Sequence, residues 1–104
     1  MSVFFSLDNG VELHRESPAT FWIPPQAERE SLQVGDCAKC IFRIEIDDAV
    51  HVERMWVIVQ DVGNGWYTGI LDNDPYCTDE ISSGILIEFT PDHVIQIDRG
   101  PATQ

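Results

Sequence analysis

Apolar and polar residues alternate along the middle of the chain with the period of two that is typical of β-strands. Residues 40–46 place Cys40, Phe42 and Ile44 on one side and mostly charged side chains on the other. Residues 50–62 form the longest predicted strand, and both of its sides are apolar in the middle. This pattern favours a strand at the centre of a sheet or in the wall of a barrel.

Tight turns and short apolar runs predict the remaining strands. The Gly-Asn-Gly sequence at residues 63–65 predicts a hairpin turn into a return strand over residues 66–71. Gly69, inside that strand, indicates a bulge or a close approach of a neighbouring backbone. Two further apolar runs, residues 85–89 and 94–97, predict the last strands.

Two short helical segments are predicted around prolines. Pro25 suits the first turn of a helix, where its missing N–H costs nothing, and residues 26–32 continue as a good helical segment. Gly35 is placed to end this helix. Thr90 followed by Pro91 predicts a single capped helical turn before the last strand.

The N-terminal residues 1–19 are predicted as a hairpin, or as an arm that docks on the core. Residues 3–7 and 11–14 alternate as strands do, and the Asp-Asn-Gly sequence between them is a turn signal. A chain of 104 residues has room for one domain, which we expect to have its core over residues 20–98 and a frayed tail over residues 99–104.

These elements predict a mainly β domain, built as a small antiparallel barrel-like sheet of about five or six strands. One short helix lies in its N-terminal part, and a one-turn helix precedes its last strand. An α+β arrangement is the alternative fold class.

The excess of acidic residues is the strongest feature of the composition. Eighteen Asp and Glu oppose six Lys and Arg, which gives a formal net charge of −12. Nucleic acids and anionic membranes are bound through basic side chains, so neither class of partner fits this chain. The charge favours a basic protein partner and fast association, although it can also serve solubility alone. Without a signal-peptide pattern or a long apolar run, the chain is predicted to be cytoplasmic.

The three cysteines predict reduced, structural thiols. Cys37 and Cys40 form a C-x-x-C sequence, but it opens a strand pattern, whereas a redox motif needs its first cysteine at a helix N-terminus. A structural zinc site needs four ligands, and only Cys77 with a histidine could complete one. We therefore expect no metal, no cofactor and no disulfide framework.

The sequence contains no pattern that specifies a reaction. Residues 82–84 do not form the G-x-S-x-G turn of a nucleophilic serine, and no phosphate-binding glycine loop precedes a helix. His93 follows Asp92 in the predicted capped turn, where we expect a structural role. The protein is therefore predicted not to be an enzyme and to have no catalytic residues.

The densest cluster of carboxylates lies in one predicted loop, at Asp72, Asp74, Asp79 and Glu80. The cluster lacks the glycine and the ligand spacing of an EF-hand calcium loop, so it is not predicted to bind a metal. Together with the aromatic side chain of Trp66, these carboxylates form the surface that we expect to bind a basic partner.

Arg54 is the basic residue for which two arrangements are open. A buried Arg54 would pair with Asp72 or Asp74, whereas an exposed Arg54 would mark a groove for an anion together with Trp22 and Trp56. The second arrangement would be that of a small-ligand-binding or regulatory domain.

Several short sequences carry a family resemblance: Glu-Arg-Met-Trp-Val at residues 53–57, Tyr-Thr-Gly at 67–69, Leu-Asp-Asn-Asp-Pro at 71–75, Phe-Trp-Ile-Pro-Pro at 21–25 and Phe-Thr-Pro-Asp-His-Val at 89–94. They resemble small bacterial proteins of domain-of-unknown-function family 2314. The likeness covers about residues 20–97 and departs at Cys37 and Cys40, where aliphatic residues are expected. It implies an uncharacterised function, and similar-looking families occur beside polymorphic toxins as immunity proteins.

The first functional prediction is a non-enzymatic binding module of the immunity type, which blocks the basic active site of a toxin partner. A small-ligand-binding or regulatory domain is the second hypothesis, and a small hydrolase is the third. The oligomeric state is open, because an exposed edge strand beside the hairpin could pair with itself in a weak homodimer.

Overall fold

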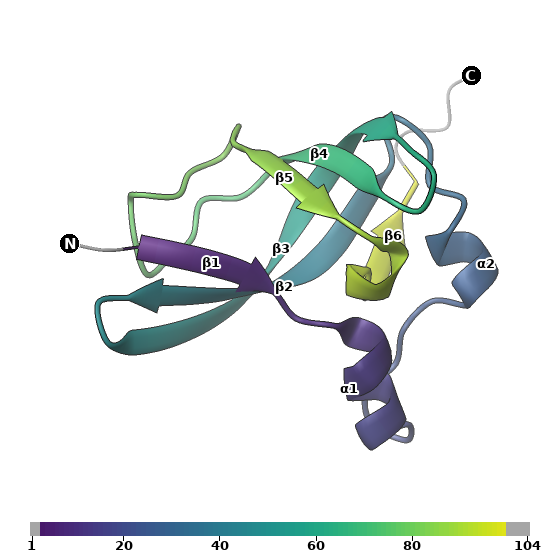
Figure 1. The fold of residues 1–104 in the computed structure, drawn as a ribbon, viewed down its shortest axis with the longest axis horizontal. Coiled ribbons are helices and arrows are strands. Elements are labelled where there is room, and N and C mark those ends of the chain that lie inside the picture. Colours follow the sequence, from purple (N-terminus) through teal and green to yellow (C-terminus); the bar gives the residue numbers. More distant parts are fainter. Residues whose placement is uncertain (1–2, 100–104) are drawn as a thin grey trace.

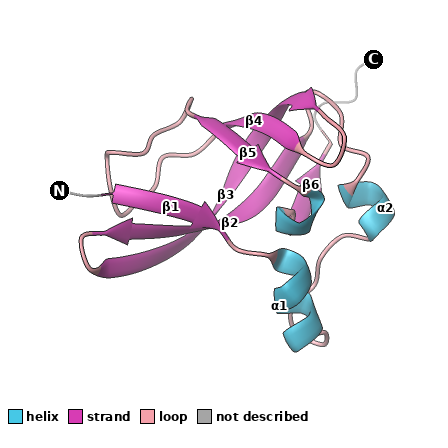
Figure 2. Cartoon of the chain, in the orientation of Figure 1, coloured by secondary structure: helices cyan, strands magenta, loops and turns pink. Residues whose placement is uncertain are grey.

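The computed structural model describes residues 3–99 and shows a mainly β protein (Figure 1). Its strands form one antiparallel sheet that curls into a half-barrel, and the helices gather at one end of it (Figure 2). The predicted fold class, a small barrel-like antiparallel sheet, is confirmed. The strands are β1 (Val3–Leu7), β2 (Cys37–Ile46), β3 (Ala49–Val62), β4 (Tyr67–Leu71), β5 (Leu86–Phe89) and β6 (Gln96–Asp98).

The long strands β2 and β3 pair with each other and form the largest part of the sheet. The strand order is β1-β2-β3-β4-β5, and β6 pairs with the N-terminal end of β2, on the edge that β1 uses further along. Between β1 and β6, the Asp8 amide donates to the Ile41 carbonyl and the Ile95 amide donates to the Lys39 carbonyl, at 3.0 and 2.9 Å. The chain therefore leaves the sheet after β1 and returns to it before β6 at neighbouring positions in the middle of β2.

The predicted N-terminal hairpin is wrong in its second half. The residues after β1 form the helix α1 (Gly10–Glu16) instead of a second strand. The Asn9 side chain, expected in a β-turn, accepts a hydrogen bond from the Glu12 amide at 3.0 Å and caps this helix. Gly10 is buried against Ile95, and an added Cβ would lie 2.8 Å from that side chain. A run of four alternating residues does not distinguish a strand from one turn of helix, and here the cap and the packing decide.

Both helical segments beside prolines are present, although the first is shorter than predicted. Helix α2 (Gln26–Arg29) ends at Arg29, and Leu32, which the prediction included in the helix, lies beyond it and is buried in the core. The 3₁₀ helix η1 (Pro91–His93) follows Thr90 as predicted, and a capping box lies at its N-terminus. No helix within residues 3–99 is long and apolar enough to cross a membrane.

Gly69 was predicted to mark a bulge or a close backbone approach, and the structure shows both at this position. An added Cβ at this position would lie 2.5 Å from Val57 Cγ1 and 2.6 Å from the Ile58 carbonyl oxygen of β3. The pairing of β3 with β4 shifts its register between Val59 and Asp61, directly beside this glycine. The close approach of β3 therefore requires glycine here.

We predict that Gly69→Ala lowers the free energy of unfolding by about 1–3 kcal/mol, because the methyl group would overlap the β3 backbone. Urea denaturation measures this change. The matched control is Thr68→Ala at the next, half-buried position, which should cost less than about 1 kcal/mol. A Gly69→Ala protein as stable as wild type would show that β3 can move away at no cost.

Candidate functional site

Two adjoining grooves lie around the Trp66 side chain, which is 48% exposed. The larger groove, of about 650 Å³, lies between the β3–β4 hairpin, Glu30 at the end of α2, and η1. The smaller groove, of about 440 Å³, lies over β4 and β5 and extends to His93. Trp66 and Thr90 line both of them, and we refer to the two together as the Trp66 groove.

The Trp66 groove is acidic. The exposed residues Glu30, Glu88 and Asp92 line it, and no Lys or Arg is found among the described residues that line it. The indole of Trp66 and the ring of Pro91 provide apolar surface between these carboxylates. A ligand that complements the groove must therefore bring positive charge around an apolar centre.

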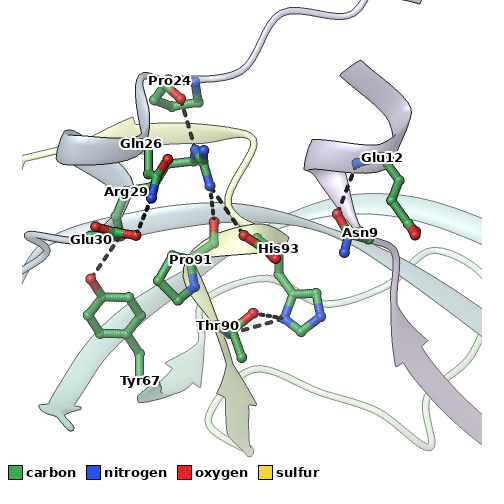
Figure 3. Close-up of polar contacts among 11 residues, drawn as sticks. Asn9, Glu12, Pro24, Gln26, Arg29, Glu30, Tyr67, Thr90, Pro91 and His93 are labelled. Carbon is green, nitrogen blue, oxygen red and sulfur yellow. Dashed lines mark hydrogen bonds and ion pairs between the residues drawn. The ribbon is translucent and has the colours of Figure 1, made fainter. Parts of the chain in front are cut away.

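The buried side chain of Arg29 holds two walls of the groove together (Figure 3). Its Nε donates to the Pro24 carbonyl at 2.9 Å. Its Nη1 donates to the Pro91 carbonyl at 3.0 Å and lies 3.6 Å from Asp92 Oδ1. We call these three contacts the Arg29 clamp. The clamp joins α2 to η1, so Glu30 and Asp92 come to line the same groove.

Tyr67 joins α2 to the sheet (Figure 3). Its hydroxyl donates to the Arg29 carbonyl at 2.8 Å and accepts from the Leu32 amide at 3.2 Å. Its ring packs on Phe89 of β5, with the ring centroids 5.2 Å apart. Because the hydroxyl is buried, losing it would leave two backbone groups without a partner. The C-terminal end of α2 is therefore fixed to the start of β4, beside the groove.

The ring of His93 is held in one tautomer. The Thr90 amide donates to His93 Nδ1 at 3.0 Å, so the proton of the neutral ring is on Nε2 (Figure 3). Burial lowers the pKa of His93, and the neighbouring Asp92 carboxylate opposes this shift. Protonation would put a hydrogen on Nδ1 and remove the acceptor of the Thr90 amide. The neutral ring is therefore the form that maintains η1.

The structure separates Trp66 from the predicted cluster of loop carboxylates. The cluster follows β4 whereas Trp66 precedes it, so they lie beyond opposite ends of that strand (Figure 1). Asp74 Oδ1 accepts a hydrogen bond from the Ser83 amide at 2.8 Å and so helps to shape the loop. The role of the cluster in binding stays a prediction. Its members are Asp72, Asp74, Asp79 and Glu80.

Arg54 is exposed, and its guanidinium carbon lies 5.6 Å from the centre of the Phe21 ring. This cation–π contact is the partner of Arg54 in place of a loop aspartate. The Lys39 ammonium lies 4.9 Å from the centre of the Trp56 ring, and Trp22 is 67% exposed. The Trp66 groove includes none of these residues, so the ligand groove predicted around Arg54 is not the one described here.

The C-x-x-C cysteines lie on opposite faces of β2. Residues three apart in a strand point in opposite directions, and Cys40 is completely buried while Cys37 is partly exposed. Burial raises the pKa of the Cys40 thiol to about 12. Cys77 lies in the loop after β4, where its amide donates to Glu53 Oε2 at 3.1 Å. Within residues 3–99, no group of His, Cys, Asp and Glu side chains has the arrangement of a metal site.

Apart from Trp66, the sequence did not indicate the residues that build the groove. Arg29 was one of six scattered basic residues, and its main partners are carbonyl groups, which leave no signal in a sequence pattern. Tyr67 was predicted only as a strand residue. The Thr-Pro pair before η1 was a usable signal, but it predicted the capped turn and not the groove beside it.

Comparison of the chain with protein-family models, with curated proteins and with solved structures finds no match. The resemblance to family 2314 therefore stays a prediction. Geometry and charge are the basis on which the Trp66 groove can be assigned a function.

We predict that Arg29→Met lowers the free energy of unfolding by about 2–4 kcal/mol, because it leaves the Pro24 and Pro91 carbonyls without their donor. Urea denaturation measures the change. The matched control, Gln26→Ala on the same helix, removes an exposed hydrogen bond to Glu30 and should change stability by less than about 0.5 kcal/mol. An Arg29→Met protein as stable as wild type would contradict the clamp.

We also predict that His93 makes the protein less stable in mild acid. Because the pKa of folded His93 is below the ordinary value of 6.5, the unfolded chain binds the proton first. The neutral His93 ring contributes its full stabilisation above the unfolded-state pKa of 6.5, and this stabilisation is lost as the pH falls to the folded-state pKa. Urea denaturation from about pH 7.5 to about pH 5.5 measures the slope. His93→Gln should flatten it and the exposed control His51→Gln should not, whereas equal slopes would contradict the assignment.

Proposed function

We propose that the protein is a non-enzymatic binding module that holds a basic protein surface in the Trp66 groove. One observation carries the proposal: a half-exposed indole shares its groove with the carboxylates of Glu30, Glu88 and Asp92, and no Lys or Arg is among the described residues of the lining. This arrangement complements a partner that presents Lys or Arg side chains around an apolar contact.

The indole and the carboxylates have different tasks in this proposal. A tryptophan near the centre of an interface contributes a large part of the affinity once the partner excludes water from it. The surrounding carboxylates orient a positively charged partner and increase its association rate. The net charge of −12 extends this attraction beyond the contact itself.

The walls of the groove are fixed before any partner arrives, which reduces the entropy lost on binding. The Gly63 amide donates to the Trp66 carbonyl at 2.9 Å and closes the hairpin that carries the indole. The Arg29 clamp and the Tyr67 hydroxyl hold the opposite wall.

A basic toxin active site is the partner we favour, which would make the protein one of the immunity type. The acidity of the chain supports this, and so does its resemblance to family 2314, since families similar to that one occur beside polymorphic toxins. Such an inhibitor only has to cover an active site, so it needs no catalytic group. A hydrolase has less support, because His93, the histidine that lines the groove, is used in the capping box.

We predict that Trp66→Ala weakens binding of the basic partner by roughly 30-fold, as expected for a central aromatic residue. The double variant Glu30→Gln/Glu88→Gln should weaken it by about tenfold and reduce the salt dependence of the association rate. A partner captured from the source cell on the immobilised wild-type protein is purified, and its binding kinetics are measured at several ionic strengths.

The matched control is Asp79→Asn/Glu80→Gln, which removes the same amount of charge from the loop at the other end of β4. It should leave the affinity within about twofold, since its carboxylates lie away from the groove. If it weakens binding as much as the groove variant, the partner recognises overall charge. If it alone weakens binding, the loop is the site and the proposal is wrong.

A further inference from the structure

Strand β5 has a free edge beside the Trp66 groove. It is the last strand in the order β1-β2-β3-β4-β5, and within residues 3–99 it pairs only with β4 (Figure 1). Glu88 of β5 lines the groove, and so do Phe89 at its end and Thr90 after it. An extended segment paired with β5 would therefore lie beside residues that line the groove.

The bonds to β4 determine which backbone groups of β5 are free. The Leu71 amide of β4 donates to the Ile85 carbonyl at 2.9 Å, immediately before β5 begins. In an antiparallel pair, residues bonded to the neighbouring strand alternate with residues that point away from it. The backbone N–H and C=O groups of Ile87 and Phe89 therefore point to β4. Those of Leu86 and Glu88 point to the free edge.

The edge of β5 is short, at four residues, but it carries no lysine, proline or bulge. Edge strands commonly carry one of these features, which prevents pairing with another chain. β5 has the sequence Leu-Ile-Glu-Phe and pairs with β4 in unbroken register. Leu86 is 65% exposed, and Glu88 is the one charged residue of the strand.

We infer that the basic partner supplies an extended segment that pairs with this edge and adds a strand to the sheet. Its backbone would bond to the free groups of Leu86 and Glu88. A Lys or Arg on its outer side would lie beside the Glu88 carboxylate, and apolar side chains on its inner side would extend the buried row of Ile87 and Phe89. This inference rests on the proposed function, because it names how the same partner binds.

The charges favour a basic segment over a second copy of this chain. Two copies would each bring a net charge of −12. Any register that matches the inner faces of two β5 strands would also place both Glu88 side chains on the same outer face, where like charges repel. A Lys or Arg of a basic segment turns that repulsion into attraction.

A capped hexapeptide of alternating valine and lysine tests the inference on the whole protein. Amide hydrogen exchange followed by NMR should show at least about tenfold slower exchange at Leu86 and Glu88 when the peptide binds, because these amides gain partners. The amides of Ile87 and Phe89, which face β4, are internal controls and should change much less. Unchanged exchange at Leu86 and Glu88 with saturating peptide would overturn the inference.

Two control peptides isolate the backbone and the charge. The same peptide with alternate amides N-methylated keeps its side chains but loses donors, and it should bind roughly tenfold more weakly. A valine–glutamate peptide should not bind, and Glu88→Gln should weaken the binding of the valine–lysine peptide. Equal binding of the N-methylated peptide would mean docking through side chains alone. Slow exchange at Leu86 that depends on protein concentration without peptide would identify a second copy as the occupant, and either result overturns the inference.

The failure of this inference can be told apart from failure of the proposed function. If the peptide leaves Leu86 and Glu88 unprotected while Trp66→Ala still weakens binding of the partner, the groove binds a basic surface without strand addition. If the peptide protects both amides while Trp66→Ala leaves capture unchanged, strand addition is supported and the Trp66 groove is not the partner's site.

Discussion

The burial of one guanidinium is the interaction on which the candidate site depends. A buried charge is tolerated only when hydrogen bonds and a counter-charge replace the water that it loses. Arg29 meets this requirement by reaching the carbonyls of Pro24 and Pro91 and approaching Asp92. Those groups belong to short segments that offer little surface for packing against each other, since α2 is only four residues long and η1 only three. Arg29 therefore holds the two walls of the groove together.

Several basic residues are engaged in contacts within the protein, which leaves the excess of acidic side chains without counter-charges. Half of the six basic residues contact a carboxylate within 3.6 Å. Each of these contacts joins segments far apart in the sequence, so the scarce positive charges stabilise the tertiary structure. Of the three carboxylates that line the Trp66 groove, Asp92 alone forms an ion pair within residues 3–99, so Glu30 and Glu88 leave a negative field that a basic partner can meet. The paired residues are Arg29 with Asp92, Arg43 with Asp8 and Arg99 with Asp36.

Periodicity and turn chemistry predicted the sheet well, because strands and tight turns are specified by neighbouring residues. The alternation through β2 and β3, the hairpin at residues 63–65 and the capped turn after Thr90 are all present. The prediction failed at Asn9, where the same residues that favour a turn serve as a helix cap. The C-x-x-C sequence shows the opposite case, since strand geometry by itself places Cys37 and Cys40 on opposite faces.

The sequence by itself determined the strands, the acidity and the lack of a reaction motif, since each of these depends on residue type and short spacing. Only the tertiary structure decided which carboxylates lie beside Trp66. The loop cluster is nearer in sequence, yet a strand of five residues separates it from the indole. Glu30, Glu88 and Asp92 reach the indole through strand pairing and through a buried arginine. Contacts of this kind have no sequence spacing of their own, because they are set by how the sheet curls and by which polar groups must be satisfied inside it.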